Sequence, residues 1–190
     1  MEPEQRRRSR KVYNDPGHAH SLTFSCYHRY RFLESERACL WLADAICEAR
    51  AKYEFQLWAY VFMPDHAHLI VWPQRQPYDI STILKAIKNP VGRKAAAHLR
   101  KHAAHWLERI AVKHGNRTEY RFWEAGGGYD RNLIEPRTLM ATINYIHLNP
   151  TRKELVTRAS EWKWSSAGWF EGHELNCLKP DPIPPEWLMD

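Results

Sequence analysis

Two histidines, His66 and His68, stand one residue apart inside the apolar segment 61–72. Side chains alternate between the two faces of a β-strand, so both rings should point to the same side, with their Cα atoms roughly 7 Å apart. Ala67, between them, should face the opposite side. Two imidazoles at this spacing can bind one cation. The segment therefore predicts a metal site on a buried strand.

Tyr145 and Asn149 lie in a segment where helical periodicity predicts a last long helix, beginning after Pro136 and ending at Pro150. Their spacing of four residues places both on one helix face, about 6 Å apart along the axis. Tyrosine can form covalent intermediates, although ionising a phenol with a pKa near 10 costs roughly 4 kcal/mol at pH 7. A nearby cation, with its coordination completed by the Asn149 amide oxygen, could offset that cost and polarise a phosphoryl oxygen. Packing plus a helix cap is the commoner explanation of such a pair, and spacing alone does not separate the two.

Basic residues gather in two clusters, an N-terminal arm and a group in the middle of the chain. These clusters are Arg6, Arg7, Arg8, Arg10 and Lys11, and then Lys85, Lys88, Arg93, Lys94, Arg100 and Lys101. Residues 171–190 hold five acidic residues against Lys179, a net charge of −4, so the overall +6 leaves +10 on residues 1–170. Such a body attracts polyanions, and the nine Trp and nine Tyr offer faces on which unpaired bases stack. Ordinary solvated surface remains the alternative explanation for either cluster.

Composition predicts a single domain. A chain of 190 residues that is 44% hydrophobic can bury a core, and its mean hydropathy is −0.66. No apolar run of about 18 residues exists, and the N-terminus lacks the apolar core of a signal peptide. We therefore expect a cytoplasmic protein without a membrane segment. The four cysteines form no C-x-x-C pair, which indicates reduced thiols.

Hydrophobic periodicity predicts a sheet built around a hairpin. Alternating residues at 21–27 predict a first strand. Residues 55–62 and 66–72 predict two more strands, joined by a tight turn and therefore antiparallel. Between the first two strands, residues 34–53 carry apolar side chains at helical spacing, with Ser35 as the expected N-cap.

The following segment is predicted to alternate helices with one further strand. An amphipathic helix should begin after Asp79 and break at Pro90. Residues 93–112 predict a second helix, and residues 120–124 predict a fourth strand. The glycines at 126–128 predict a flexible turn. We find no internal repeat and no second domain.

Three segments together carry a family resemblance. They are Met63-Pro64-Asp65-His66-Ala67-His68-Leu69, then Tyr145-Ile146-His147-Leu148-Asn149-Pro150-Thr151-Arg152, and then Trp164-Ser165-Ser166. In this order they resemble the REP-associated tyrosine transposases, which belong to the insertion-sequence-200-like group of HUH endonucleases. The resemblance spans roughly residues 12–170. It implies an α+β fold, with helices packed on an antiparallel sheet of four to five strands, as in ferredoxin-like and RNA-recognition (RRM-like) arrangements.

The resemblance also implies a mechanism. His66 and His68 would bind a divalent metal, Mg²⁺ or Mn²⁺, with Asn149 as the third protein ligand. Tyr145 would attack a phosphodiester of single-stranded DNA, leaving a 5′-phosphotyrosine link and a free 3′-hydroxyl that can later rejoin strands. The expected substrate is hairpin-forming DNA, and related transposases occur as homodimers. The predicted DNA contacts are Arg6, Arg7, Arg8, Arg10, Lys11, Lys85, Lys88, Arg93, Lys94 and Arg152.

The chain departs from the family pattern at three places. Members commonly have Asn at Asp65, a larger aliphatic residue at Ala67, and Val-Arg-Ala-Gly at 151–154. A carboxylate at Asp65 could orient a histidine ligand, although a plain turn residue is the commoner role at that position. These departures leave the four proposed active groups in place.

Other histidines compete as candidate ligands. His18 and His20 repeat the His-x-His spacing, but they precede the apolar residues of the first strand instead of lying among them. His98, His102 and His105 recur along a predicted helix without the carboxylate of an H-E-x-x-H motif, which favours a solvated face.

The domain organisation expected from these patterns is a basic arm (1–11), a transposase domain (12–170) and an acidic tail (171–190). Two other functions stay open: a non-catalytic binder of structured DNA or RNA with the same fold, and a metal-dependent hydrolase in which water attacks and Tyr145 is structural.

Overall fold

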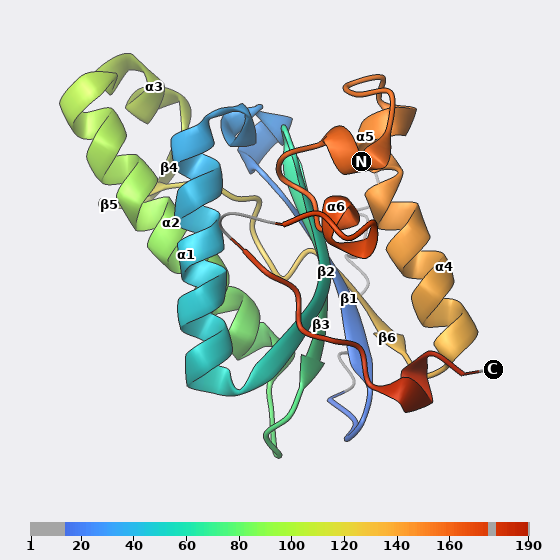
Figure 1. The fold of residues 1–190 in the computed structure, drawn as a ribbon. Helices are drawn as coiled ribbons and strands as arrows, with labels where there is room; N and C mark the ends of the chain where they lie inside the picture. Colours follow the sequence, from blue (N-terminus) through green and yellow to red (C-terminus); the bar gives the residue numbers. More distant parts are fainter. Residues whose placement is uncertain (1–13, 175–177, 190) are drawn as a thin grey trace, which may run out of the picture.

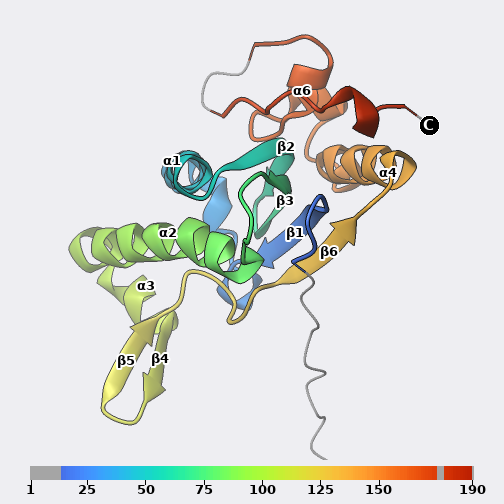
Figure 2. The same cartoon turned by 90° about the horizontal axis from the view of Figure 1, so that it is seen from below.

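The computed structural model describes residues 14–174 and 178–189. Its centre is an antiparallel sheet with strand order β2-β3-β1-β6, made of β1 (Ala19–Ser25), β2 (Phe55–Met63), β3 (His66–Pro73) and β6 (Tyr129–Leu133). Helices α1 (Glu36–Tyr53) and α2 (Ile80–His102) lie on one face (Figure 1). Helix α4 (Pro136–His147) lies on the other (Figure 2). The predicted α+β fold with a four-stranded antiparallel sheet is confirmed.

The predicted hairpin forms the middle of the sheet. Strands β2 and β3 pair antiparallel on either side of the turn at Pro64 and Asp65, and β3 pairs antiparallel with β1 on its other side. Thr23 of β1 lies directly opposite His68 of β3. Because β3 has neighbours on both sides, its histidines are held in a central strand.

Two apolar layers fix the helices against the sheet. The layer under α1 and α2 includes Leu22, Leu42, Ile46, Leu69, Ile83 and Ile87. The layer under α4 includes Ala19, Trp58, Val61, Ile70, Ile143 and Ile146. Each fully buried aliphatic side chain contributes about 1.5–3 kcal/mol. Leu69 and Ile70 belong to opposite layers, so strand alternation assigns His66 and His68 to the α4 face.

The fourth strand of the sheet was predicted at the wrong place. Residues 122–124 pair with the chain at the end of β1 through an isolated bridge between Trp123 and Cys26, but they form no strand of the sheet, and Phe122 and Trp123 bury their rings in the core under α2. The fourth strand is β6, whose polar sequence carries no hydrophobic alternation. Before it, α3 (Ala104–Arg109) leads into a separate two-stranded ribbon made of β4 (Ala111–His114) and β5 (Arg117–Tyr120), which projects from the body in Figure 2.

The predicted break at Pro90 is also wrong, because α2 runs through it as one helix. An interior proline removes one backbone hydrogen bond and costs about 3 kcal/mol or more. Burial of Ile83, Ile87 and Val91 along the same face offsets that cost. The predicted start after Asp79 is confirmed, and the Asp79 carboxylate caps α2 by accepting a hydrogen bond from the Ser81 amide at 2.9 Å. Ser35 occupies the N-cap position of α1, but its side chain makes no capping hydrogen bond.

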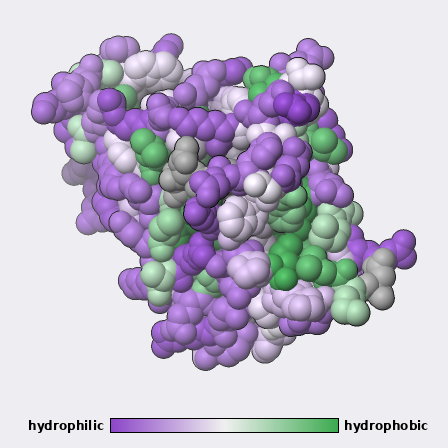
Figure 3. Space-filling view, viewed as in Figure 1, coloured by the Kyte–Doolittle hydropathy of each residue, from purple (hydrophilic) through white to green (hydrophobic). Residues whose placement is uncertain are grey.

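The C-terminal segment packs along the outer edge of β2. The backbone amides of Phe62, Ser166 and Asp181 donate hydrogen bonds to the carbonyls of Trp164, Tyr60 and Leu57, respectively. Shorter elements complete the chain: η1 (Tyr27–Arg29), η2 (Phe32–Glu34), α5 (Asn149–Arg152), η3 (Ala159–Glu161), α6 (Ala167–Phe170) and η4 (Pro185–Trp187). Seen from the same side as in Figure 1, the surface is mostly hydrophilic, with a small hydrophobic patch at the lower right (Figure 3). Among the described residues, no helix is long and apolar enough to cross a bilayer.

Candidate active site

The ring nitrogens of His66 and His68 converge on one point of the α4 face. Their Nε2 atoms lie 3.0 Å apart. The opposite ring nitrogens are held from behind: His66 Nδ1 donates to Asp65 Oδ1 at 2.7 Å, and His68 Nδ1 is hydrogen-bonded to Thr23 Oγ1 at 2.7 Å. Because a carboxylate can only accept, the neutral His66 ring carries its proton on Nδ1 and leaves Nε2 free as a ligand.

Burial keeps both imidazoles in the neutral form that binds metals. It lowers the pKa of His68 to about 3. Burial also lowers the pKa of His66, although the hydrogen bond and charge of Asp65 oppose that shift. Burial alone would raise the pKa of Asp65, but its hydrogen bond with His66 and the charges of His66 and Arg29 outweigh it and lower the pKa. At neutral pH the site therefore holds two neutral donors and one ionised carboxylate.

The two Nε2 atoms are spaced so that both could bind one divalent ion. A separation of 3.0 Å between two donors is close to that of adjacent ligands roughly 2.1 Å from an octahedral ion. Within residues 14–174 and 178–189, no group of three His, Cys, Asp or Glu side chains forms a complete cage. A third protein ligand would therefore be of another type. The predicted third ligand is Asn149, whose Nδ2 donates to the carbonyls of Tyr145 (3.0 Å) and Ile146 (3.2 Å). Its Oδ1 is the atom that could ligate an ion.

Tyr145 faces the histidines from α4. Its ring centroid lies 6.4 Å from that of His68, with the ring planes at 84°. The side chain is 52% exposed, so its phenol is accessible from solvent. The Arg152 guanidinium lies 4.8 Å from the centroid of the Tyr145 ring, a cation–π contact. The structure thus brings together the predicted nucleophile, the two imidazoles and one predicted DNA contact.

A cleft of about 720 Å³ opens beside these groups, between α4 and strands β1 and β6. Its lining residues are Ser21, Thr23, His68, Tyr129, Arg131, Arg137, Thr138, Ala141, Thr142, Tyr145 and Ile146. None of them is acidic, and Arg131 and Arg137 make no ion pair within the described part of the chain. Unbalanced positive charge in a cleft attracts anions such as phosphates. Sequence reasoning missed both arginines, because no motif contains them and β6 was not recognised as a strand.

Gly128 allows β6 to begin against β1 at this cleft. Its φ is +72°, and a Cβ at this position would lie 2.1 Å from the carbonyl oxygen of Thr23. Only glycine fits such an approach without displacing the backbone. The predicted glycine turn therefore has a definite role, which is to place β6 next to the residue that supports His68.

Comparison with known proteins identifies the family. The sequence model described as "Transposase IS200 like" matches residues 17–149, which is more than half of the chain. The chain belongs to the IS200-like transposase family. Membership implies a DNA-cleaving enzyme that acts in DNA transposition. The matched range includes His66, His68, Tyr145 and Asn149.

Solved structures support the fold of this IS200-like transposase. A REP-associated tyrosine transposase bound to a REP hairpin is similar with a TM-score of 0.67 and 18% identity, over 96% of this chain and 93% of that chain. A transposase candidate from Deinococcus radiodurans R1 gives a TM-score of 0.44 and 20% identity, over 73% of this chain and 95% of that chain. Only the first similarity is high enough to identify a shared fold. No curated protein shows significant similarity to the chain.

The predicted DNA contacts of this transposase on α2 do not line the cleft. Lys85 and Arg93 line a second groove of about 800 Å³ between α2 and residues 119–127, on the opposite side of the sheet. Lys88, a predicted DNA contact, is buried: its Nζ donates to the carbonyls of Glu124 (3.1 Å) and Gly126 (2.7 Å), and burial lowers its pKa. Lys94 Nζ lies 3.7 Å from an Asp44 carboxylate oxygen on α1. The arm residues Arg6, Arg7, Arg8, Arg10 and Lys11 lie outside the described residues.

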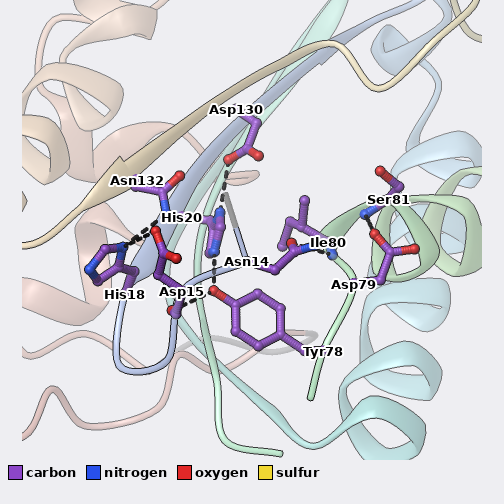
Figure 4. Close-up of polar contacts among 10 residues, drawn as sticks. All are labelled: Asn14, Asp15, His18, His20, Tyr78, Asp79, Ile80, Ser81, Asp130 and Asn132. Atoms are coloured by element: carbon purple, nitrogen blue, oxygen red, sulfur yellow. Dashed lines mark hydrogen bonds and ion pairs between the residues drawn. The ribbon is translucent and has the colours of Figure 1, made fainter. Parts of the chain in front are cut away.

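The competing histidines have structural contacts. His20 lies between Asp130 and Tyr78 (Figure 4). It is fully buried, with Nδ1 2.9 Å from Asp130 Oδ1 and Nε2 2.7 Å from the Tyr78 hydroxyl. His18 Nδ1 lies 3.0 Å from Asn132 Nδ2. These contacts tie β6 to β1 from the face opposite the cleft, so the His-x-His repeat at 18–20 positions a strand.

Proposed function

We propose that this transposase is a divalent-metal-dependent tyrosine nuclease and strand transferase acting on single-stranded DNA. Tyr145 is the nucleophile, and His66, His68 and Asn149 hold the ion. One observation carries the proposal: the imidazoles of His66 and His68, each held through Nδ1, lie together, and the exposed Tyr145 ring faces His68. The cleft beside them has no acidic residue in its lining.

The reaction transfers a phosphoryl group from a 3′-oxygen of the DNA to the Tyr145 oxygen. The Tyr145 oxygen attacks the phosphorus of a phosphodiester, a tyrosine–phosphorus bond forms, and the bond to the 3′-oxygen breaks. The phenolic proton leaves to solvent at the exposed side chain, and the departing 3′-oxygen takes up a proton. Attack by a 3′-hydroxyl on the 5′-phosphotyrosine reverses these steps and rejoins strands.

The chain's own residues position the substrate and the ligands. Asp65 and Thr23 fix the two rings through Nδ1. Arg131 and Arg137 attract the DNA backbone into the cleft, and Arg152 packs its guanidinium over the Tyr145 ring. A Mg²⁺ or Mn²⁺ ion, when bound, would polarise the phosphoryl group and neutralise developing charge.

We propose hairpin-forming DNA as the substrate, supported by family membership and by the hairpin bound to the structural relative. The test incubates the protein with Mn²⁺ and a fluorescent hairpin that carries a single-stranded extension. Wild type should form a covalent adduct that survives denaturing gels. Tyr145→Phe should abolish the adduct, while Tyr53→Phe, on α1 at the opposite face, should retain it.

The remaining outcomes of this test contradict the proposal in distinct ways. Hydrolysis that persists in Tyr145→Phe would assign the attack to water. Binding by wild type without cleavage in either Mg²⁺ or Mn²⁺ would assign a non-catalytic binder of structured nucleic acid.

A further inference from the structure

The β4–β5 ribbon has no place in either core layer. Neither strand contains a buried residue, and the ribbon projects from the body (Figure 2). It is anchored only at its base, where Ile110, Phe122 and Trp123 are buried and the Arg121 amide donates to the Ile110 carbonyl at 2.8 Å. An isolated two-stranded hairpin is at best marginally stable in water. The ribbon therefore contributes little to folding, which suggests that it serves binding.

The far end of the ribbon presents hydrogen-bond donors that suit DNA bases. Asn116 and Arg117 are exposed, and the turn between the strands includes Gly115 at φ +57°. Arg117 lies opposite His114 in register, so both side chains share one face. Arginine pairs in bidentate fashion with guanine and asparagine with adenine in the major groove, which admits a two-stranded ribbon.

Fixed cations surround the base of the ribbon. The Arg100 guanidinium lies 5.2 Å from the Tyr120 ring centroid, and the Arg109 guanidinium lies 4.8 Å from that of Trp106. Arginines stacked on aromatic rings lose less freedom when they bind phosphate. The one acidic residue of the ribbon, Glu119, is already paired with Arg121 at 2.9 Å. Lys113 and Arg117 make no ion pair in the described part of the chain.

We infer that the β4–β5 ribbon enters the major groove of the duplex stem of a DNA hairpin. Asn116 and Arg117 face the base edges, and Arg100 and Arg109 contact flanking phosphates. Residues 121–128 connect the ribbon directly to β6, the strand that lines the catalytic cleft. The inference rests on the proposed function only in requiring a DNA substrate.

The test measures equilibrium binding in the Tyr145→Phe background, so that it does not depend on cleavage. The probes are a DNA hairpin with a stem of about one helical turn and a single-stranded extension, the extension alone, and the same hairpin made of RNA. We expect Asn116→Ala/Arg117→Ala to weaken binding of the DNA hairpin by at least about tenfold and to leave binding of the extension unchanged. Arg75→Ala, an exposed arginine on the loop after β3, should change neither.

The two hairpins and a conservative variant separate groove binding from general attraction. The major groove of RNA duplexes is too deep and narrow for side chains to reach bases, so the RNA hairpin should not lose affinity in the double variant. Arg117→Lys should keep the salt dependence of binding but lose preference among stems enriched from a randomised pool. Thermal unfolding should match wild type, since the ribbon tip is outside the core.

Three results would overturn the inference: unchanged affinity for the DNA hairpin, equal losses for hairpin and extension, or equal losses for DNA and RNA hairpins. A failure of Tyr145 to form an adduct would reject the proposed chemistry and leave this binding result intact.

Discussion

Replacing Asp65 with asparagine should weaken metal binding without disturbing the fold. Asp65 Oδ1 accepts the His66 Nδ1 proton at 2.7 Å, and its Oδ2 lies 3.2 Å from Arg29 Nη1. Asparagine has the same shape and can still accept from His66, but it removes the negative charge that makes His66 Nε2 a stronger donor. The Asp65 carbonyl, which accepts from the Cys26 amide at 2.8 Å, is unaffected by the substitution.

The expected loss of metal affinity follows from this geometry. Loss of a carboxylate behind a ligating histidine typically costs 10–100-fold in metal affinity, or about 1.4–2.7 kcal/mol. Titration of the metal-free protein with Mn²⁺ by calorimetry should show that increase in Kd for Asp65→Asn. Cleavage should fall at limiting Mn²⁺ and return close to the wild-type rate at saturation, because Tyr145 and the cleft arginines are unchanged.

Asp44→Asn is the matched control, since Asp44 is an exposed carboxylate on α1 whose ion-pair partner is Lys94. It should titrate like wild type. If Asp65→Asn and Asp44→Asn gave the same Mn²⁺ affinity, the argument that Asp65 supports a metal ligand would be wrong, and Asp65 would serve only the turn.

Three further predictions concern stability. Gly128→Ala should lower the free energy of unfolding by about 2–4 kcal/mol in urea titrations, because the new side chain meets both a positive φ and the Thr23 backbone. Gly126→Ala meets nothing within 4 Å, so it should lower the free energy of unfolding only by the cost of the positive φ, about 1–2 kcal/mol. Burial lowers the pKa of His147 to about 4, so the unfolded chain takes up a proton first as pH falls below about 6.5. The free energy of unfolding should therefore decline by up to about 3 kcal/mol from pH 6.5 to 4. His147→Gln should flatten this decline in urea titrations at each pH. Lys88→Met should reduce the melting temperature by several degrees because it leaves two loop carbonyls without their donor, while Lys85→Met on the exposed side of α2 should leave it nearly unchanged.

The sequence predicted the elements whose pattern depends on the core. The first three strands, the hairpin at Pro64 and the first and last long helices lie where apolar periodicity placed them. The correctly predicted elements include β3, which carries the histidine pair, and α4, which carries Tyr145, because both elements have strong burial patterns. Their proposed chemical roles remain predictions.

The missed elements have polar patterns set by tertiary contacts. Strand β6 alternates cleft residues such as Arg131 with Asp130, which is buried against His20, so neither of its faces looks hydrophobic in sequence. Neither strand of the ribbon contains a buried residue. Pro90 was expected to end a helix, and only the packing of residues on both sides of it explains why the helix continues.

One margin of the sheet is closed to further strands. Along β2, amides and carbonyls already pair with the returning C-terminal chain. Strand margins with unpaired backbone groups are where polypeptides add to one another. The returning chain therefore blocks lateral addition of a second copy or an extended peptide at β2, at the end of the sheet order farthest from β6.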